Sequence, residues 1–478
     1  MQTSPKPEEQ HQVKKKRTMK LPHIYVILFI LAAAGAIMSY IIPAGEYDRV
    51  PGPNGQEAID PDSFTQVEAS PVTLTDFMFA IPRGLIDASE IVFFTFIIGG
   101  AFMVLRHTGI IEIGVERLAR KFQTKSLMIV PVLITIFAMI ATIIGTPELS
   151  LVYIPVLIPL MISLGYDSMT AAAIALVSTC LGFTAGLTNP GTVGLPQQVS
   201  GLELYSGIGM RVVVFVVIVI IGCWYIARYA KKVRANPQSS LVYDDDKEKR
   251  ELYKDELTKE PKTLSKRQKV AIWTLPIFFG ILVFGILQFG WFMMEISGLF
   301  IFIGVIVGLI AGLSITNICE AFTEGFREIL VGAIVIGLAR AISVVMEDGQ
   351  ILDTIVFGLG GIVGQLPGAF SAVSMQYVQM TINFFIPSGS GQALVTMPIM
   401  APLSDIAGVT RQTAVLAYQF GDGFAQILFP TSGHFMAALV IAGVSWGKWV
   451  RFFFPLFLIY MAVASAFLIF AYMIQWTG

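Results

Sequence analysis

Long apolar stretches recur along the chain and alternate with short polar segments. A helix that crosses the hydrocarbon core of a bilayer needs about 20 mostly apolar residues. Windows that meet this requirement include 24–42, 91–105, 211–227, 270–287, 296–313 and 450–473. The pattern predicts an all-α polytopic membrane protein with about nine transmembrane helices.

Composition supports the same class of protein. Hydrophobic residues make up 55% of the 478 residues and charged residues 14%, and the mean hydropathy is +0.72. A soluble core cannot bury so much apolar surface. Cys180, Cys223 and Cys319 have no paired spacing, so neither a disulfide framework nor a zinc site is expected. The basic residues near the N-terminus are interpreted as a topology signal and not as a nucleic-acid site.

The charged segments predict the topology. Residues 1–20 are polar and basic and are expected to form a cytoplasmic tail. The segment 43–75 carries six acidic residues and one basic residue, Arg49, and is expected outside the cell. A helix at 73–88 is expected to lie in the interface, and 107–125 along the cytoplasmic surface. The full-length helices are expected at 21–42, 90–106, 207–229, 269–289, 293–315, 331–346 and 446–475.

The longest hydrophilic stretch is expected to be a cytoplasmic linker between two halves. Residues 230–269 contain twelve Lys or Arg and eight Asp or Glu. Its simplest interpretation is a solvated connection, and the alternative is a segment that binds phosphate or a partner. The resulting organisation is a tail (1–20), a first repeat (21–229), a linker (230–268) and a second repeat (269–475).

An internal repeat is visible between the halves. The spacing of Pro155, Pro159 and Gly165 recurs 243 positions later. The Thr170–Ala171 pair recurs at the same displacement. The residues that match these five are Pro398, Pro402, Gly408, Thr413 and Ala414. The alternative is two unrelated membrane helices that each contain two prolines.

A polar segment interrupts the apolar sequence just before each proline pair. We call residues 145–150 (GTPELS) the first tip and residues 387–392 (PSGSGQ) the second tip. Apolar arms flank both, which predicts re-entrant hairpins at 126–164 and 367–406. Irregular backbone at membrane depth is tolerated only where it is buried in protein or lines a cavity, so each tip marks a site.

A second interruption follows each proline pair. We call residues 186–192 (GLTNPGT) the first break and residues 429–434 (FPTSGH) the second break. Proline, glycine and hydroxyl or amide side chains within an apolar run are typical of broken transmembrane helices, expected here at 168–203 and 410–443. A proline kink without a ligand is the alternative for either break alone. With the tail inside, the two hairpins open to opposite faces and the repeats are inverted. If each hairpin were a full span, the repeats would be parallel, and charge alone does not decide between the two arrangements.

Nearly the whole chain resembles the YfcC/DcuC group of carriers within the ion-transporter superfamily. The resemblance rests on the start LPH (21–23) with IPAGEY (42–47), on TNPG (188–191) and on QFGDGF (419–424). Members of the group are described as C4-dicarboxylate carriers or basic amino acid antiporters. The resemblance implies a midplane site built from two tips and two breaks, an elevator-like movement and a homodimer. The Ser-Asn-Thr tip motif of sodium-coupled relatives is absent, so the coupling ion, proton or sodium, stays open.

Ionisable groups at membrane depth are costly and usually functional. Glu148 lies in the first tip, and Asp422 and His434 lie in the second broken helix. The two acids are interpreted as groups that bind a substrate cation or carry coupling protons. Alternatively, Arg340 neutralises one of them permanently. His434 is either titrating or structural.

These considerations give two sets of candidate residues. The candidate substrate- or ion-binding residues are Thr146, Glu148, Ser150, Thr188, Asn189, Thr192, Ser388, Ser390, Gln392, Asp422, Thr431, Ser432 and His434. The candidate backbone breaks are Gly145, Pro147, Pro190, Gly191, Gly389, Gly391, Gly421, Gly423, Pro430 and Gly433.

The most economical function is secondary active transport of a small charged metabolite in the inner membrane. Two acids near the site favour an amino acid, especially a basic one, over a C4-dicarboxylate, which would need compensating positive charge. An ion channel is a more distant alternative, because neither a fourfold filter nor a ring of charges is visible. With four histidines and only His434 at membrane depth, an enzyme, a metal site or a cofactor is not expected. The expected partners are the small-molecule substrate and the bilayer.

Overall fold

The computed structural model describes residues 24–51, 57–122, 126–145, 147–253, 264–289, 291, 293–364, 366 and 368–478. The predicted tail, 1–20, lies outside these residues. Helices account for most of the described chain, and six of them are long and apolar enough to cross a membrane. These six are α3 (Ser89–His107), α7 (Ser168–Ala185), α9 (Ile208–Ala235), α12 (Met293–Ala311), α13 (Ile315–Asp348) and α19 (Trp446–Met473). The protein is an all-α polytopic membrane protein.

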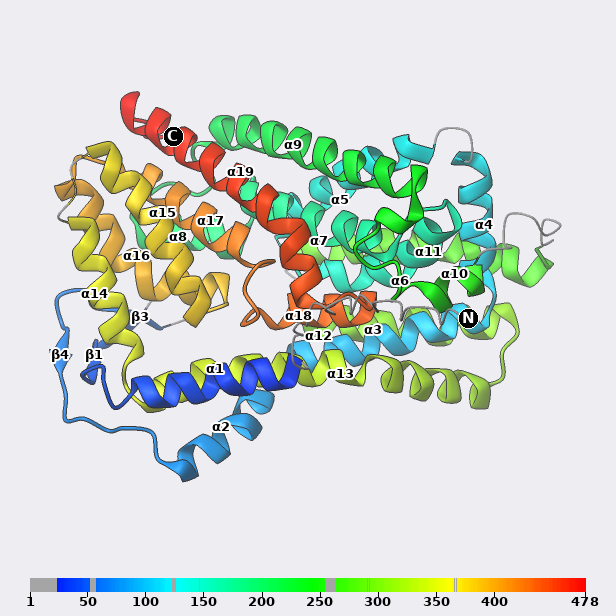
Figure 1. The fold of residues 1–478 in the computed structure, drawn as a ribbon, viewed down its shortest axis with the longest axis horizontal. Coiled ribbons are helices and arrows are strands. Elements are labelled where there is room, and N and C mark those ends of the chain that lie inside the picture. Colours follow the sequence, from blue (N-terminus) through cyan, green and yellow to red (C-terminus); the bar gives the residue numbers. More distant parts are fainter. Residues whose placement is uncertain are drawn as a thin grey trace, which may run out of the picture.

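The first half contains further helices around this set. They are α1 (Ile24–Met38), α2 (Leu74–Asp87), α4 (Ile110–Phe122), α5 (Ser126–Ile144), α6 (Leu149–Ser163) and α8 (Leu195–Val199). The second half adds α11 (Lys266–Phe289), α14 (Leu352–Gly364), α15 (Gly368–Phe385), α16 (Gly389–Ile406), α17 (Arg411–Ala425) and α18 (Gly433–Ala442). Figure 1 shows α1 lying along α13, while α9 lies along the opposite edge and α19 runs obliquely from that edge toward α18.

The centre of the molecule is formed by the first arms of the two broken helices. All residues of α7 are buried, as are residues 412–425 of α17. Alanine and glycine recur in both helices, and small residues allow helix backbones to approach closely in a membrane. The site described below lies at the ends of these two arms.

The elements that surround α7 and α17 follow the same order in each half. A helix pair (α5 and α6, or α15 and α16) precedes each arm, and a long helix (α9 or α19) follows the broken helix. Asp167 caps α7 by accepting from the Thr170 amide, and Thr410 caps α17 by accepting from the Thr413 amide. The two caps are 243 positions apart, which is the displacement of the sequence repeat.

Three segments differ from the sequence expectation. Helix α13 begins at Ile315 and not near residue 331, because its polar first half continues the helix without a proline. Helix α14 was not predicted. The described part of the segment 43–75, expected as an outside loop, contains short strands that were not predicted: β1 (Gly45–Glu46) pairs with β4 (Thr65–Gln66), and β2 (Arg49–Pro51) pairs with β3 (Glu57–Ile59), both antiparallel.

The linker also differs from a solvated connection. Its residues 237–253 contain a 3₁₀ turn (Pro237–Ser239) and α10 (Lys247–Tyr253), and they dock on the protein. Asp246 is fully buried and accepts hydrogen bonds from the amide (2.7 Å) and hydroxyl (2.6 Å) of Ser168, at the start of α7. Lys249 binds Asp246 and donates to the carbonyl of Ala442, the last residue of α18, over 2.7 Å. The interpretation as a purely solvated linker was therefore wrong for this part.

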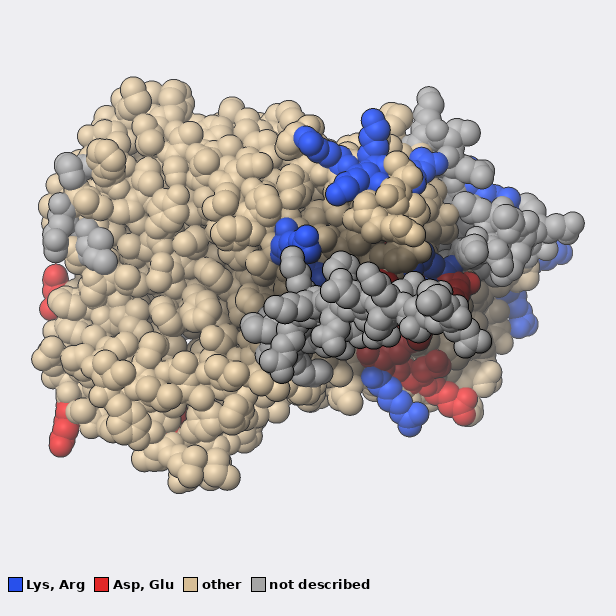
Figure 2. Space-filling model, viewed as in Figure 1, with Lys and Arg blue, Asp and Glu red and all other residues tan. Residues whose placement is uncertain are grey.

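Charged side chains are distributed unevenly over the surface. On the face shown in Figure 2, Lys and Arg gather toward the end where α4 and α10 lie. The opposite part of this face is almost free of basic side chains. Such an asymmetry is what the positive-inside rule expects if the end with α10 is cytoplasmic.

Candidate functional site

The first tip packs directly against the first break. Gly145 has a positive φ of 77°, and a Cβ on it would lie 2.6 Å from Cγ of Asn189. The hydroxyl of Thr142, in α5 just before the tip, accepts a hydrogen bond from the amide of Leu187 over 3.1 Å. Because of this φ and this short distance, only a glycine at position 145 allows the first tip to approach Asn189 so closely.

The first break contains buried polar atoms without a partner. Helix α7 ends at Gly186 in the left-handed conformation, and a π-helical turn then begins at Pro190. Asn189 caps this turn through Oδ1, which accepts from the amides of Gly191 (3.0 Å) and Thr192 (3.2 Å). Among the described residues, Nδ2 of Asn189 and the hydroxyl of Thr192 have no hydrogen-bond partner.

The second tip meets the first break and α17 at one point. A Cβ on Gly389 would lie 2.5 Å from Cγ2 of Thr192 and 3.1 Å from Oδ2 of Asp422. The hydroxyl of Tyr418, one turn before Asp422, donates to the carbonyl of Gly389. Residues from both halves of the sequence therefore converge around the Asp422 carboxylate.

The two oxygens of Asp422 have different surroundings. Oδ1 accepts hydrogen bonds from the side-chain amides of Asn383 and Gln426, each over 2.7 Å. Oδ2 is buried and has no partner in the described part of the chain. A buried carboxylate oxygen is costly unless it is paired, so Oδ2 is suited to bind a cation or to hold a proton.

The second break is connected to Asp422 through Gln426. The hydroxyl of Ser432 lies 3.3 Å from Oε1 of Gln426 and 3.3 Å from Nδ1 of His434. The hydroxyl of Thr431 and Nε2 of His434 are buried without a hydrogen-bond partner within the described ranges. Both breaks and the second tip thus contribute polar atoms to one buried cluster.

Some predicted residues have no side-chain hydrogen bond to this cluster within the described chain. Thr188 and Ser388 are exposed, and Ser390 is half-buried. The hydroxyl of Ser150 donates to the Pro147 carbonyl over 2.9 Å, which is a local contact. Glu148 is half-buried at the start of α6 and does not cap it with its side chain. Thr146 lies outside the described residues.

Gly421 and Gly423 are not backbone breaks, which corrects the sequence expectation. Both lie inside α17, and the interruption begins after Ala425. Their role is close packing: a Cβ on Gly421 would lie 2.5 Å from the Gln376 carbonyl, and one on Gly423 would collide with Thr184 of α7. The remaining candidate breaks lie at or beside interruptions or helix starts: Gly145, Pro147, Pro190, Gly191, Gly389, Gly391, Pro430 and Gly433.

An amide network lies behind Asp422, and of its members only Gln392 was among the predicted residues. Asn383 of α15 donates to Oε1 of Gln392 (3.1 Å) as well as to Asp422. Gln392 donates in turn to the carbonyl (2.9 Å) and the side chain (2.7 Å) of Gln379. The available signal was the presence of amide side chains in the apolar segment 376–383. This network fixes the second tip relative to α15 and α17.

Arg340 does not neutralise either candidate acid. Its guanidinium lies 3.3 Å from Glu347 and 3.8 Å from Asp87. The described residues contain no ion pair between Arg340 and Glu148 or Asp422. They also contain no group of three His, Cys, Asp or Glu that could hold a metal ion.

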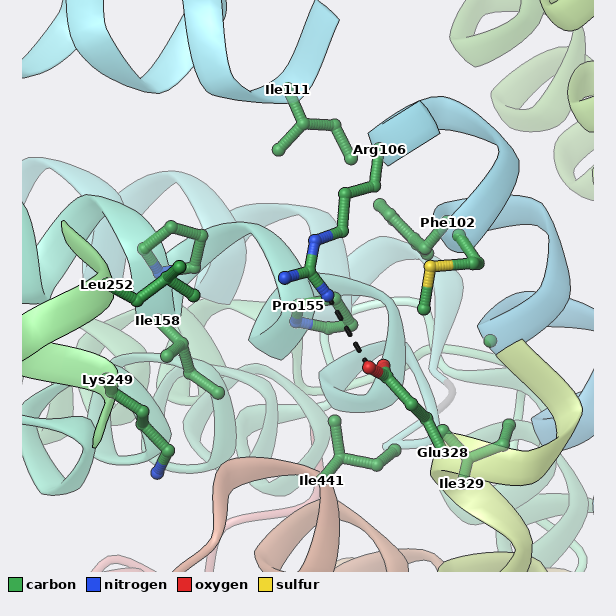
Figure 3. Close-up of a pocket in the computed structure, with 13 residues that line it drawn as sticks. Phe102, Arg106, Ile111, Pro155, Ile158, Lys249, Leu252, Glu328, Ile329 and Ile441 are labelled. Carbon is green, nitrogen blue, oxygen red and sulfur yellow. Dashed lines mark hydrogen bonds and ion pairs between the residues drawn. The ribbon is translucent and has the colours of Figure 1, made fainter. Parts of the chain in front are cut away.

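A separate cavity of about 290 Å³ opens beside α10. Figure 3 shows Arg106 of α3 paired with Glu328 of α13 over 3.4 Å at its wall, with Lys249 of α10 nearby. Apolar side chains and the prolines of α6 form most of the rest. An apolar crevice of about 360 Å³ reaches Phe429 and Pro430 of the second break.

The chain is similar to known proteins over nearly its whole length. The family model for DcuC, the C4-dicarboxylate anaerobic carrier, matches residues 21–473. The chain is 31% identical over 479 residues to an Escherichia coli K12 protein named "Putative basic amino acid antiporter YfcC", covering 92% of this chain and 94% of that protein. A Haemophilus influenzae protein without a described function is 27% identical, over 95% and 98% of the two chains.

Two solved structures are similar to this chain with TM-scores of 0.43. One is the efflux pump MtrF of Neisseria gonorrhoeae, with 16% identity and coverage of 94% and 95%. The other is the YdaH transporter of Alcanivorax borkumensis, with 14% identity and coverage of 95% and 99%. The family match and the YfcC relative, which span nearly the whole chain, confirm the predicted family. The chain belongs to the DcuC family of carriers and is a multi-pass membrane transport protein, not an enzyme.

Proposed function

We propose that the protein is a secondary active transporter of an amino acid, with a basic amino acid as the first candidate, and that Asp422 binds the cationic group of this substrate. The observation that carries the proposal is the unpartnered Oδ2 of Asp422, buried beside Gly389 and Thr192. An ammonium or guanidinium group would supply both the missing charge and the missing hydrogen bond.

The distribution of positive charge supports a cationic or zwitterionic substrate. Arg340 is engaged by Asp87 and Glu347. In the described chain, the hydrogen-bond donors to Asp422 are neutral amides. Glu148, in the first tip, would supply a second negative charge when the transport cycle brings it to the substrate. The name of the YfcC relative is consistent with this choice.

A C4-dicarboxylate is the second candidate. The family model carries the name of such a carrier. The arms that begin at Pro190 and Gly433 direct helix N-termini toward the breaks, and helix N-termini favour anions. A dianion bound there would need Asp422 to be protonated, so this candidate makes Asp422 a proton carrier.

The mechanism that we propose is alternating access with an elevator-like movement. The two repeats would be inverted and inserted in the inner membrane with the N-terminus in the cytoplasm. Coupling would use protons, sodium or exchange, and the protein would be a homodimer. The contacts that join both breaks and the second tip favour a unit that moves as one body.

The test is transport by purified protein in proteoliposomes. If Asp422 binds substrate, Asp422→Asn should weaken the affinity for arginine or lysine by about tenfold or more, because a charge-assisted hydrogen bond is lost. If it carries the proton, the variant should keep binding and exchange but lose pH-driven uphill uptake. Asp405→Asn, at an exposed acid paired with Arg411, is the control. Wild-type transport by Asp422→Asn would contradict both versions.

A further inference from the structure

Arg211 is a buried cation that the proposed transport site does not use. It lies in the first turn of α9 and is fully buried. Its three side-chain nitrogens, Nε, Nη1 and Nη2, have no hydrogen-bond partner in the described part of the chain. The ion pairs between described residues do not include it.

Such an arrangement is unfavourable without an additional ligand. An arginine side chain stays protonated in proteins and presents five N–H donors. Burial removes the guanidinium from water, and without a counter-charge nothing compensates the loss of its hydration free energy. Its place at the start of a helix adds to the cost, because the positive end of the helix dipole repels a cation.

The start of α9, where Arg211 lies, is close to the start of α17. Side chains on a helix lean toward its N-terminus, which directs the guanidinium toward Gly207 and Ser206. The carbonyl of Ser206 already accepts from Gln197 (2.9 Å) and Gln412 (2.6 Å). Gln412 belongs to the first turn of α17, so the N-termini of α9 and α17 meet here.

Other groups at this junction do not provide a counter-charge. Asp405 is exposed and paired with Arg411 over 2.7 Å. Arg411 also donates to the Ser200 carbonyl over 2.9 Å. The hydroxyl of Ser200 is buried and has no partner among the residues described. The junction thus combines a buried guanidinium, two helix N-termini and a free hydroxyl.

We propose that Arg211 anchors a second site, separate from Asp422, that binds a small monovalent anion. The ligand is either an inorganic anion such as chloride or a carboxylate. A carboxylate supplied by the transported amino acid would rest on the proposed function, whereas chloride binding would not. The site lies where the end of α8 meets the starts of α9 and α17. Because α8 and α17 belong to the first and the second broken helix, a bound anion stabilises the contact between them.

Thermal unfolding of the full chain in detergent tests this site. The sodium salt of a bulky sulfonate buffer, MES, is replaced at constant ionic strength by sodium chloride or sodium acetate. The smaller anions should raise the Tm of the wild type in a saturable way, because a ligand that binds the folded state stabilises it by mass action. In a second arm, arginine is compared with agmatine, which lacks the carboxylate.

The variants separate the sources of the anion. Arg211→Gln should abolish the shifts, and Arg211→Lys should bind roughly tenfold more weakly, because lysine keeps the charge but not the fork of donors. Arg228→Gln is the matched control, since Arg228 lies on the same helix, is exposed and stacks on Trp224. A shift with chloride or acetate that depends on Arg211 identifies a free anion. A shift with arginine but not agmatine that depends on Arg211 identifies the substrate carboxylate.

Two results would overturn the proposal. One is a wild-type Tm that is the same in MES, chloride and acetate and does not distinguish arginine from agmatine. The other is an anion-dependent shift that survives in Arg211→Gln. If Arg211→Gln does not fold, the anion-dependent shifts in Tm of the wild type and of Arg211→Lys test the proposal. Asp422→Asn should keep the chloride-dependent shift in Tm. The anion site at Arg211 and the transport site at Asp422 can therefore be refuted independently of each other.

Discussion

The thiol of Cys180 in α7 donates a hydrogen bond to the backbone carbonyl of Gly423 in α17, with an Sγ–O distance of 3.3 Å. The two residues are 243 positions apart, the displacement that relates the proline pairs and the caps Asp167 and Thr410. Equivalent positions of two repeats touch where a symmetry axis between them passes. Such a contact is expected if a two-fold axis relates the halves and passes near the contact between α7 and α17, and this relation stays a prediction.

The polar side chains of the breaks should be necessary for transport. Asn189→Leu or Ser432→Leu should abolish uptake. Asn189→Leu removes the hydrogen bond that caps the turn after the first break, and Ser432→Leu removes the hydrogen bond between the second break and Gln426. Uptake into proteoliposomes and the amount of folded protein in the membrane are measured together. Thr381→Leu, at an exposed hydroxyl on α15, is the control. Normal uptake by both break variants would exclude a shared site.

The close approach of the second tip to Asp422 gives a steric prediction. Gly389→Ala should strongly reduce transport, because the new methyl group would lie 2.5 Å from Thr192 and 3.1 Å from Oδ2 of Asp422. Gly209→Ala, where a methyl group meets nothing within 4 Å, should leave transport unchanged. Initial uptake rates at equal protein density provide the comparison. Equal rates for the two variants would show that the tip does not pack on the site during transport.

The docked linker should contribute to stability. Asp246→Ala should lower the free energy of unfolding by roughly 3 kcal/mol, because it leaves the Ser168 amide and Lys249 without their buried carboxylate. Asp245→Ala removes an exposed ion pair with Lys448 and should cost less than about 1 kcal/mol. Thermal or denaturant unfolding of the purified variants measures the difference. A solvated linker would instead give equal, small effects.

The proposed topology can be tested by labelling. In a variant without native cysteines, Asp244→Cys in the linker should react with an impermeant maleimide only from the cytoplasmic side. Glu203→Cys, between α8 and α9, should react only from the outside. Both positions are exposed. Reaction of the linker position from outside would reverse the proposed orientation, and reaction of both from one side would exclude a spanning α9.

Helix positions could be predicted because membrane helices follow apolar windows directly. The interruptions at 186–192 and 429–434 were visible because proline, glycine and polar residues stand out against apolar flanks. Asn383 and Gln426 were missed, although amides stand out in the apolar segment 376–383 and Gln426 follows Asp422 by four residues. The sequence does not show which group such an amide binds, and for Asn383 the partner, Asp422, lies on another helix. Those two contacts span 39 residues and four residues respectively.

Tertiary contacts also explain the other differences. Asp87 ends α2 and could not be assigned to Arg340 without the fold, which brings α2 and α13 together. Glu347 lies seven residues beyond Arg340 on α13 itself. The strands between α1 and α2 form where Arg49 pairs with Asp353 of α14 over 2.9 Å. Arg211 lies at the edge of an apolar stretch, where snorkelling toward the interface is the usual expectation, and its burial depends on the packing of α9.

The contact between Ser168 and Asp246 also has a consequence for the order of events during biosynthesis. The two residues are 78 positions apart, so the start of α7 leaves the ribosome well before its carboxylate partner. Lys249 then meets Ala442, which is 193 positions away, near the end of synthesis. A nascent chain that stopped after α9 would lack both contacts. The packing around the start of α7 is therefore completed only after the linker is made, and the linker's contact with α18 only after most of the second half has been translated.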